Sequence, residues 1–434
     1  MDKFLISGGA PLVGTIHVSG AKNSALPCMA AAILTEDEIV LENIPHVRDI
    51  ETERKLLASM GAEVELVDGP ANPHTRIRCA TLSDPVAKYE IVKTMRASSL
   101  VLGPLVARTG MARVAMPGGC AIGGRPIDLH IKGLEKMGAT IIQEHGYLEA
   151  RAERLKGAHL VFDKITVTGT EDLLMAAVLA EGETLMENCA REPEVTDLAA
   201  LLTAMGARIE GAGTSTIVVR GVERLHGANY RINPDRIEAG TFLIAGAITH
   251  GDLTVEGCNP AHLGAVLDKL REVGARVDLL GTEAVRVRAI GPLQAADIST
   301  EEYPGFPTDM QAQYMALATQ SEGVSLVHEN IFENRFMHVQ ELIRMGAHIK
   351  VDGRIATVRG PAPLSAAAVM CSDLRASASL VLAALVADGR SVLDRVYHMD
   401  RGYERIEQKL HGVGARIERV ANAPVSQEEE ALTT

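Results

Sequence analysis

The clearest pattern along the chain is a hexapeptide, Leu-x-x-(Met or Val)-Gly-Ala, that occurs six times. Its Leu and its Met or Val are three residues apart, so they share one face of a helix. The glycine suits the left-handed position that ends a helix, and the alternating residues that follow it predict a strand. The six glycines are Gly61, Gly138, Gly206, Gly274, Gly346 and Gly414.

Successive glycines are 77, 68, 68, 72 and 68 residues apart, which indicates six copies of one unit. Upstream of each copy lies a second helical run, such as residues 173–180, followed by a short strand-like run, such as residues 184–186. Each unit is therefore predicted to contain helix, strand, helix and strand, with room for further strands. Six units could form a solenoid, a closed ring or two three-unit domains. We favour two domains, joined near the polar stretch 229–234, because units of this length exceed solenoid repeats.

Composition limits the function classes. The chain has 434 residues, 47% of them hydrophobic, but no Trp, so aliphatic side chains and Met must fill its cores. A net charge of −13 argues against broad binding of nucleic acid or anionic membrane. No apolar run reaches the roughly 18 residues of a membrane span, and we expect a cytoplasmic protein. The six cysteines are widely spaced, which favours neither a zinc site nor disulfides.

The second copy carries an insertion. Its Gly138 lies 26 positions after Ala112, against a separation of 23 positions in the matching parts of the first and third copies. The extra length falls in residues 117–126, where four glycines surround Cys120. This composition predicts a mobile lid that carries a thiol, and nearby Arg125 would favour its thiolate. The alternative is a flexible loop with an incidental cysteine. The other five cysteines are predicted to be inert.

Basic residues recur where the first helix of a unit is expected to begin, namely Lys22, Arg96 and Arg375. A cation is unfavourable beside the positive end of a helix, so we expect an anion to compensate each of them. Ordinary capping is the better interpretation of Asp235, Thr308 and Asp373 taken singly. Arg401 is another basic residue near a helix start, although Asp400 and Glu404 could pair with it.

Several segments in order resemble the bacterial UDP-N-acetylglucosamine enolpyruvyl transferases. The segments are Ser19–Asn23, Lys93–Ser98, Pro117–Cys120, Arg125–Asp128, Phe306–Gln311, Glu333–Phe336, Asp373–Arg375 and Asp400–Tyr403. The resemblance covers nearly the whole chain except the tail. It implies an α/β fold of two domains, an inside-out α/β barrel with three βαβαββ-type units in each. One domain would be residues 22–229, the other residues 1–21 plus 230–420, with a disordered tail at 421–434.

The resemblance also implies a reaction. The enolpyruvyl group of phosphoenolpyruvate moves to the 3-hydroxyl of UDP-N-acetylglucosamine, phosphate leaves, and the substrates sit in a cleft that closes on binding. Cys120 would protonate the methylene carbon and form a covalent adduct, and Asp309 would accept the hydroxyl proton. The cations that hold the phosphate and carboxylate or order the closed cleft would be Lys22, Arg96, Arg125, Arg375 and Arg401.

The nucleotide-sugar site implied by the resemblance takes in several short segments. Its residues would be Asn23, Arg125, Pro126, Ile127, Asp128, Leu129, Lys164, Ile165, Thr166, Val167, Glu192, Asp309, Ile331 and Phe332, and Asp373 and Leu374 would accompany Arg375 among the substrate-binding residues. This chain has Thr168-Gly169 where some members have Gly-Ala, which leaves the diphosphate contact of that loop open. No metal or redox cofactor is expected, and the sequence does not indicate an oligomeric state.

Two other functions fit the same repeat. A 5-enolpyruvylshikimate-3-phosphate synthase performs the same transfer on a different hydroxyl, but that enzyme lacks the cysteine lid. A catalytically silent binding protein would keep the sugar site without the chemistry. The joint presence of Cys120, Asp309 and the cations argues against it.

Overall fold

The computed structural model describes residues 2–67, 73–116 and 127–421. Its chain divides into two compact units, one formed by residues 19–235 and the other by residues 1–18 together with 236–434. The chain thus leaves one unit after Val18 and returns to it at Arg236, whereas the sequence placed these crossings after residues 21 and 229. Each unit has its own hydrophobic core.

The helices of the unit 19–235 are α1 (Lys22–Ala31), α2 (Arg48–Ser59), α3 (Tyr89–Val92), α4 (Leu102–Thr109), α5 (Asp128–Lys136), α6 (Val167–Ala177) and α7 (Pro193–Ala204). Its strands are β3 (Ile39–Glu42), β4 (Glu63–Val67), β5 (His74–Arg78), β6 (Val86–Ala87), β7 (Met111–Ala115), β8 (Thr140–Glu144), β9 (Tyr147–Arg151), β10 (His159–Val161), β11 (Glu183–Glu187), β12 (Arg208–Glu210), β13 (Thr216–Arg220) and β14 (Asn229–Arg231).

The helices of the other unit are α8 (Arg236–Ile248), α9 (Gly264–Glu272), α10 (Gln311–Ala318), α11 (Val339–Arg344), α12 (Leu374–Val386) and α13 (Ile406–His411). Its strands are β1 (Lys3–Ser7), β2 (Val13–His17), β15 (Asp252–Glu256), β16 (Arg276–Leu279), β17 (Ala284–Arg288), β18 (Ile298–Ser299), β19 (Gly323–His328), β20 (His348–Asp352), β21 (Ile355–Gly360), β22 (Ala368–Met370), β23 (Arg390–Asp394) and β24 (Arg416–Val420).

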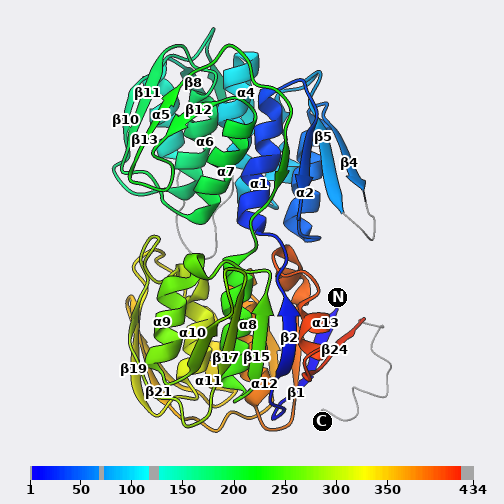
Figure 1. Ribbon diagram of the computed structural model, residues 1–434, viewed down its shortest axis with the longest axis vertical. Helices are drawn as coiled ribbons and strands as arrows, with labels where there is room; N and C mark the ends of the chain where they lie inside the picture. The colour runs from blue at the N-terminus through cyan, green and yellow to red at the C-terminus, as the bar shows by residue number, and fades with distance from the viewer. Residues whose placement is uncertain (1, 68–72, 117–126, 422–434) are drawn as a thin grey trace. The chain divides into compact units, whose positions relative to one another are not determined.

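The strands of the described residues form six four-stranded sheets of one pattern, three in each unit (Figure 1). In every sheet one outer pair is parallel and the remaining neighbours are antiparallel, as in β6-β7-β9-β8. The unit order strand, helix, strand, helix, strand, strand follows directly in β10, α6, β11, α7, β12 and β13. The predicted repeat is confirmed.

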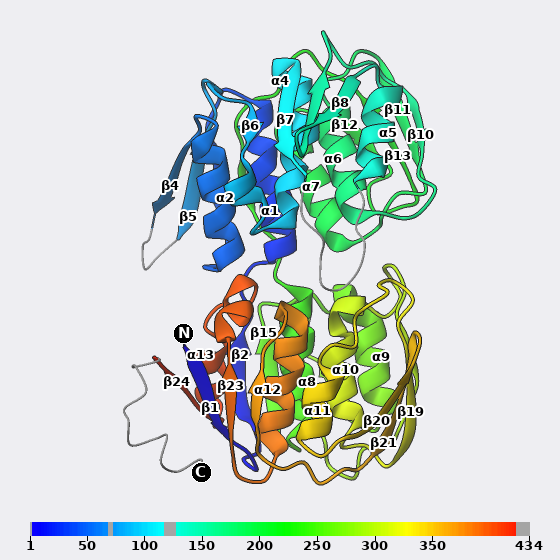
Figure 2. The same cartoon turned by 180° about the vertical axis from the view of Figure 1, so that it is seen from behind.

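Three sheets take a strand from elsewhere in the chain. β14 pairs in parallel with β3, β2 pairs in parallel with β15, and β1 lies between β23 and β24 (Figure 2). The prediction of a linker at 229–234 was therefore wrong for residues 229–231, which are a strand. The short polar run Asn229-Tyr230-Arg231 is half exposed, because an edge strand needs only one buried face.

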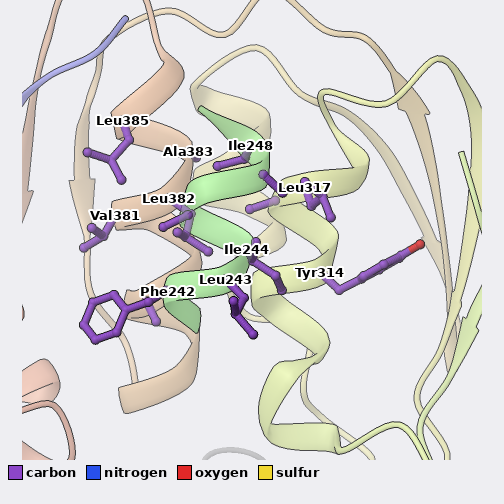
Figure 3. Close-up of a cluster of buried hydrophobic side chains, with 14 of the residues drawn as sticks. Phe242, Leu243, Ile244, Ile248, Tyr314, Leu317, Val381, Leu382, Ala383 and Leu385 are labelled. Atoms are coloured by element: carbon purple, nitrogen blue, oxygen red, sulfur yellow. The ribbon is translucent and has the colours of Figure 1, made fainter. Parts of the chain in front are cut away.

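Buried helices form the centre of the unit that contains α8. In α8, twelve of thirteen residues are buried, and α8, α10 and α12 contact one another. Figure 3 shows their aliphatic side chains meeting, including Leu243 and Ile248 of α8, Leu317 of α10 and Leu382 of α12. Helices that are apolar all round belong inside a core. The predicted reliance on aliphatic side chains is confirmed.

The six hexapeptides end their helices in one way. All six glycines have a positive φ, between 93° and 107°. In each copy the alanine after the glycine donates its N–H to the carbonyl of the leucine five residues earlier, as Ala139 does to Leu134 at 2.9 Å. The glycine N–H bonds to the residue three before it, as Gly138 does to Glu135. This is the Schellman arrangement, and it confirms the predicted glycine stop.

Replacing one of these glycines tests the backbone constraint alone. Gly138 has φ +94°, and a Cβ built there meets no atom within 4 Å. Gly138→Ala is therefore expected to lower the free energy of unfolding by about 1–2 kcal/mol, through backbone strain without a clash. Urea unfolding followed by circular dichroism measures this. Gly264→Ala is the control, because its site is equally open and its φ is −41°. An equal loss in both variants would contradict the interpretation.

Candidate active site

Asp309 lies between two arginines. It belongs to a short 3-10 helix, Thr308–Met310, directly before α10. Its Oδ1 accepts from Nη2 of Arg335 at 2.7 Å, and its Oδ2 accepts from Nε of Arg375 at 3.2 Å. Arg335 and Arg375 are only 8% and 4% exposed. Two buried guanidinium groups stabilise the ionised form of this carboxylate.

Arg375 is fixed from both sides at the start of α12. Asp373 caps this helix by accepting from the backbone N–H groups of Arg375 and Ala376, at 2.9 and 3.0 Å. The Arg375 guanidinium also lies over the Tyr403 ring, 5.3 Å from its centroid. The expected anion beside this cation is thus an internal carboxylate, that of Asp309. The expectation that Asp373 acts as a cap is confirmed.

Other residues of the predicted site belong to the same unit. Ile331 and Phe332 follow β19, and their backbone N–H groups both bind Glu329. Leu374 opens α12 and packs against Gly402. Arg401 ends the 3-10 helix Val396–Arg401.

Asp400, which the sequence offered as a partner of Arg401, forms its short ion pair with Arg419. The Nη2 of Arg419 lies 2.5 Å from the Asp400 carboxylate. The same guanidinium also contacts Glu407, with its Nε 3.2 Å from that carboxylate. Asp400 is therefore engaged in anchoring β24.

In the unit 19–235, Lys22 is the first residue of α1 and Asn23 follows it. The Lys22 Nζ lies 3.0 Å from Oδ2 of Asp49 on α2, and both residues are buried, at 9% and 4% exposed. The expected anion beside this cation is again an internal carboxylate. Charge pairing explains how a lysine tolerates a buried helix start.

Glu53 lies one helical turn after Asp49, and both of its carboxyl oxygens are buried without a hydrogen-bond partner. Burial, and secondarily the charge of Asp49, raises the pKa of Glu53 to about 8. Glu53 is therefore protonated at neutral pH, and only one of the two acids on this face of α2 carries charge beside Lys22.

The predicted nucleotide-sugar segments lie at the starts of three helices. Asp128 and Leu129 open α5, Lys164 to Thr166 lead into α6, and Glu192 precedes α7. Thr166 caps α6 by accepting from the N–H of Gly169 at 3.2 Å. A hollow of about 410 Å³ lies beside α5 and is lined in part by Leu129, Lys132, Leu160, Phe162, Asp163 and Leu173, so Leu129 is the predicted residue that borders it.

A buried polar chain supports the same region. His130 Nδ1 lies 3.0 Å from Asp172, and its Nε2 lies 3.4 Å from the Thr168 hydroxyl. Asp172 also accepts from the N–H of Gly103 at 2.7 Å. Thr168, at the position where this chain differs from some family members, thus has a partner of its own.

Arg96 opens a 3-10 helix, Arg96–Val101, that leads into α4, so the expected α-helical start lies six residues later. Cys120, Arg125 and Pro126 lie outside the described residues.

The other five cysteines are buried thiols. Burial raises the pKa of Cys79, Cys258 and Cys371 to about 11 and that of Cys189 to about 12, and it raises the pKa of Cys28 well above its ordinary value. They are poor nucleophiles at neutral pH.

The sequence did not single out Arg335, Asp49, Glu53 or Glu329. Arg335 lay within a segment that carried the resemblance, Glu333–Phe336, so a signal existed for it. Asp49 and Glu53 look like ordinary acidic residues in the first half of a helix.

Within residues 2–67, 73–116 and 127–421, no group of three His, Cys, Asp or Glu side chains is placed to hold a metal ion. No helix in these ranges is long and apolar enough to cross a membrane.

Comparison with known proteins gives consistent matches over nearly the whole chain. The family model of EPSP synthase (3-phosphoshikimate 1-carboxyvinyltransferase) matches residues 6–410. The UDP-N-acetylglucosamine 1-carboxyvinyltransferase of Acidobacterium capsulatum is 79% identical over 422 residues, 97% of each chain. Its counterpart in Koribacter versatilis is 70% identical, again over 97% of each. That of Solibacter usitatus is 63% identical over 97% of this chain and 100% of its own.

Solved structures share the fold. The enolpyruvyl transferase NikO from Streptomyces tendae superposes with a TM-score of 0.87 at 26% identity, over 97% of this chain and 99% of its own. An EPSP synthase from Acinetobacter baumannii gives 0.73 at 20% identity, over 97% and 100%. The predicted fold class, a two-domain inside-out α/β barrel, is thereby confirmed.

The raised pKa of Glu53 predicts that the stability of the protein depends on pH. Its folded-state pKa, about 8, lies above its ordinary value of 4.5, so folding retains a proton and the wild type loses stability as pH rises through this window. Glu53→Gln stays neutral throughout this window. The free energy of unfolding of the variant minus that of the wild type should therefore rise by up to about 1.4 kcal/mol per pH unit. Urea titrations across the window measure this difference.

Glu51→Gln on the same helix is the control for Glu53→Gln. Hydrogen bonds from Arg54 lower the pKa of Glu51, so its stabilising charge is complete above pH 4.5 and is lost only below that value. The difference between Glu51→Gln and the wild type should stay flat across the window. A flat difference for Glu53→Gln would show that Glu53 is ionised when buried.

Proposed function

The chain belongs to the EPSP synthase family, and from this we propose that it transfers the enolpyruvyl group of phosphoenolpyruvate to the 3-hydroxyl of UDP-N-acetylglucosamine. The observation that carries the choice of acceptor is the identity of 63–79%, over nearly full length, to three UDP-N-acetylglucosamine 1-carboxyvinyltransferases. The reaction is a step of peptidoglycan synthesis, the first committed one.

The chemistry sets the groups that are needed. The methylene carbon of phosphoenolpyruvate takes up a proton while the sugar hydroxyl loses one and attacks the adjacent carbon. The methyl group of the resulting adduct then loses a proton as the bond to phosphate breaks, which restores the double bond and releases inorganic phosphate. An acid, a base and several cations are required, and no electrons are exchanged with a cofactor.

We assign the base to Asp309. Its carboxylate is held ionised by Arg335 and Arg375, so it is in the form that accepts a proton. The two guanidinium groups also restrict its orientation, which favours a fixed attack geometry. The acid is assigned to Cys120, from the sequence alone.

The cations divide between those with structural support and those without. Lys22 is buried beside Asp49, and Arg375 is buried and shares the carboxylate of Asp309 with Arg335, so an incoming phosphate or carboxylate group meets cations already stripped of water. We assign substrate-anion binding to both. Arg96, Arg125 and Arg401 receive the same role by resemblance.

The nucleotide-sugar residues proposed from the sequence keep that role. The start of α6 supports the assignment because its free N–H groups favour an anion such as a diphosphate. The N–H of Gly169 is occupied by Thr166, so the diphosphate contact falls to the neighbouring groups of the loop. Asn23, Glu192, Ile331 and Phe332 complete the proposed contacts. A cytoplasmic location and the absence of a metal or redox cofactor belong to the same proposal.

Phosphate release tests the function. With phosphoenolpyruvate and UDP-N-acetylglucosamine together, the protein should release one phosphate for each sugar converted, because the new ether bond replaces the phosphate ester. A coupled colorimetric phosphate assay measures the rate. Phosphate release that requires shikimate 3-phosphate would assign the chain to the other branch of the family. If no phosphate is released with either acceptor, a catalytically silent binding protein is favoured.

Cys120→Ser is the matched variant for that assay. Intact mass spectrometry of the wild type after incubation with phosphoenolpyruvate or fosfomycin should show a covalent adduct that the variant lacks. Cys28→Ser is a control in a buried thiol and should leave the adduct in place. An equal adduct on Cys120→Ser would remove the thiol from the proposal.

Asp309→Ala tests the base. Turnover is expected to fall by about 10²–10⁴-fold, while phosphoenolpyruvate binding, measured by calorimetry, remains. Asp309→Asn repeats the test with less disturbance, since its carbonyl still accepts from Arg335. Asp268→Ala, an exposed acid on α9 paired with Arg271, is the control and should leave turnover unchanged. Undiminished turnover in both Asp309 variants would show that another group is the base.

A further inference from the structure

Glu329 is a buried carboxylate just after β19, and it is 1% exposed. Four groups donate hydrogen bonds to it. Oε1 accepts from the Thr300 hydroxyl at 3.0 Å and from the backbone N–H groups of Ile331 and Phe332 at 2.9 and 3.0 Å. The Thr308 hydroxyl lies 3.0 and 2.9 Å from Oε1 and Oε2. Such a concentration of donors is suited to an ionised carboxylate, which offers about four acceptor sites.

One arm of this network reaches the proposed sugar segment. The N–H groups of Ile331 and Phe332 point to one oxygen atom, which fixes the turn between β19 and the following loop. The Thr300 hydroxyl in turn accepts from the N–H of Asn330 at 2.9 Å. Three successive backbone N–H groups are thus satisfied by Glu329 and Thr300, and the segment 330–332 has little freedom to move.

The other arm reaches the proposed base. The Thr308 hydroxyl, which donates to Glu329, accepts from Nη1 of Arg335 at 3.0 Å. Nη2 of the same guanidinium donates to Oδ1 of Asp309 at 2.7 Å. The Arg335 guanidinium also lies 5.1 Å from the Phe332 ring centroid. Glu329, Thr308, Arg335 and Asp309 therefore form one continuous chain of hydrogen bonds.

We propose that Glu329 is a positioning residue that locks the sugar-binding segment 331–332 and the carboxylate of Asp309 into one rigid arrangement. The proposal rests on the proposed function and deepens it. Glu329 touches no reacting atom; it acts through Thr308 and Arg335 on one side and through two backbone N–H groups on the other. Rigid placement matters because a displacement of about 1 Å at a reacting group can cost on the order of 100-fold in rate.

Two variants separate the arms. Thr308→Val keeps the side-chain size but removes the hydroxyl, so it cuts only the chain to Asp309. Its kcat should fall about tenfold or more, with KM for UDP-N-acetylglucosamine within about twofold of the wild type. Glu329→Gln replaces Oε2 by an amide nitrogen that donates, and the remaining neutral oxygen accepts more weakly than a carboxylate oxygen does. It should lower kcat similarly and also raise that KM, because the segment 331–332 loosens.

Amide hydrogen exchange gives a readout that does not need activity. Exchange at residues 330–332 should accelerate in Glu329→Gln and stay unchanged in Thr308→Val. Glu341→Gln is the matched control, because the Glu341 carboxylate likewise accepts from a backbone N–H, that of Met370 at 3.2 Å, away from these residues. It should lose stability without a change in kcat or KM.

The outcomes are distinct. A folded Glu329→Gln whose kcat, KM and exchange match the wild type overturns the proposal. If Glu329→Gln does not fold, unchanged kcat in Thr308→Val overturns it instead. Failure of the wild type to release phosphate from the two substrates rejects the proposed function. The exchange comparison still decides whether Glu329 orders residues 330–332.

Discussion

The burial of the inner helices on every side governs where this protein can place charge. α8, α10 and α12 pack against one another with nearly all of their side chains removed from water, so their middles tolerate little but apolar groups. Burying a lone ionised side chain costs several kcal/mol. Charged residues are accordingly found at the first turns, where Arg375 is the second residue of α12 and Asp309 precedes α10. The same rule places Lys22 at the first position of α1.

Ion pairs with carboxylates offset the cost of burying these cations. Each buried cation has a carboxylate within about a hydrogen-bond length: Asp49 for Lys22, and Asp309 for Arg375 and Arg335. In the proposed reaction these charges are in place before the substrates arrive, so little reorganisation is needed when negative charge develops. Glu53, by contrast, keeps its proton at neutral pH, chiefly because it is buried and secondarily because of the charge of Asp49.

Local patterns in the sequence predicted local structure well. The hexapeptide fixed six helix ends because its information lies within six residues: an apolar pair at helical spacing and one glycine free to take a positive φ. The family segments likewise pointed to Asp309 and Arg375. What escaped prediction depends on residues far apart. Asp49 meets Lys22 across 27 residues, and Arg335 meets Asp309 across 26. Nothing local distinguishes them from surface charges. The polar edge strand β14 was mistaken for a linker for the same reason, since its partner β3 lies near the other end of the unit.

Three of the sheets combine strands that are far apart in the sequence, and this has a consequence for synthesis on the ribosome. Residues 19–235 contain every strand of their own three sheets, so this unit can close as soon as β14 has emerged. β1 and β2 are made first, yet their partners β15, β23 and β24 are made much later. The amino-terminal segment must therefore stay unpaired while a whole unit folds behind it. β24, which follows the other strands of the described residues, completes a sheet with β1, so this sheet can close only after residue 420 has been made.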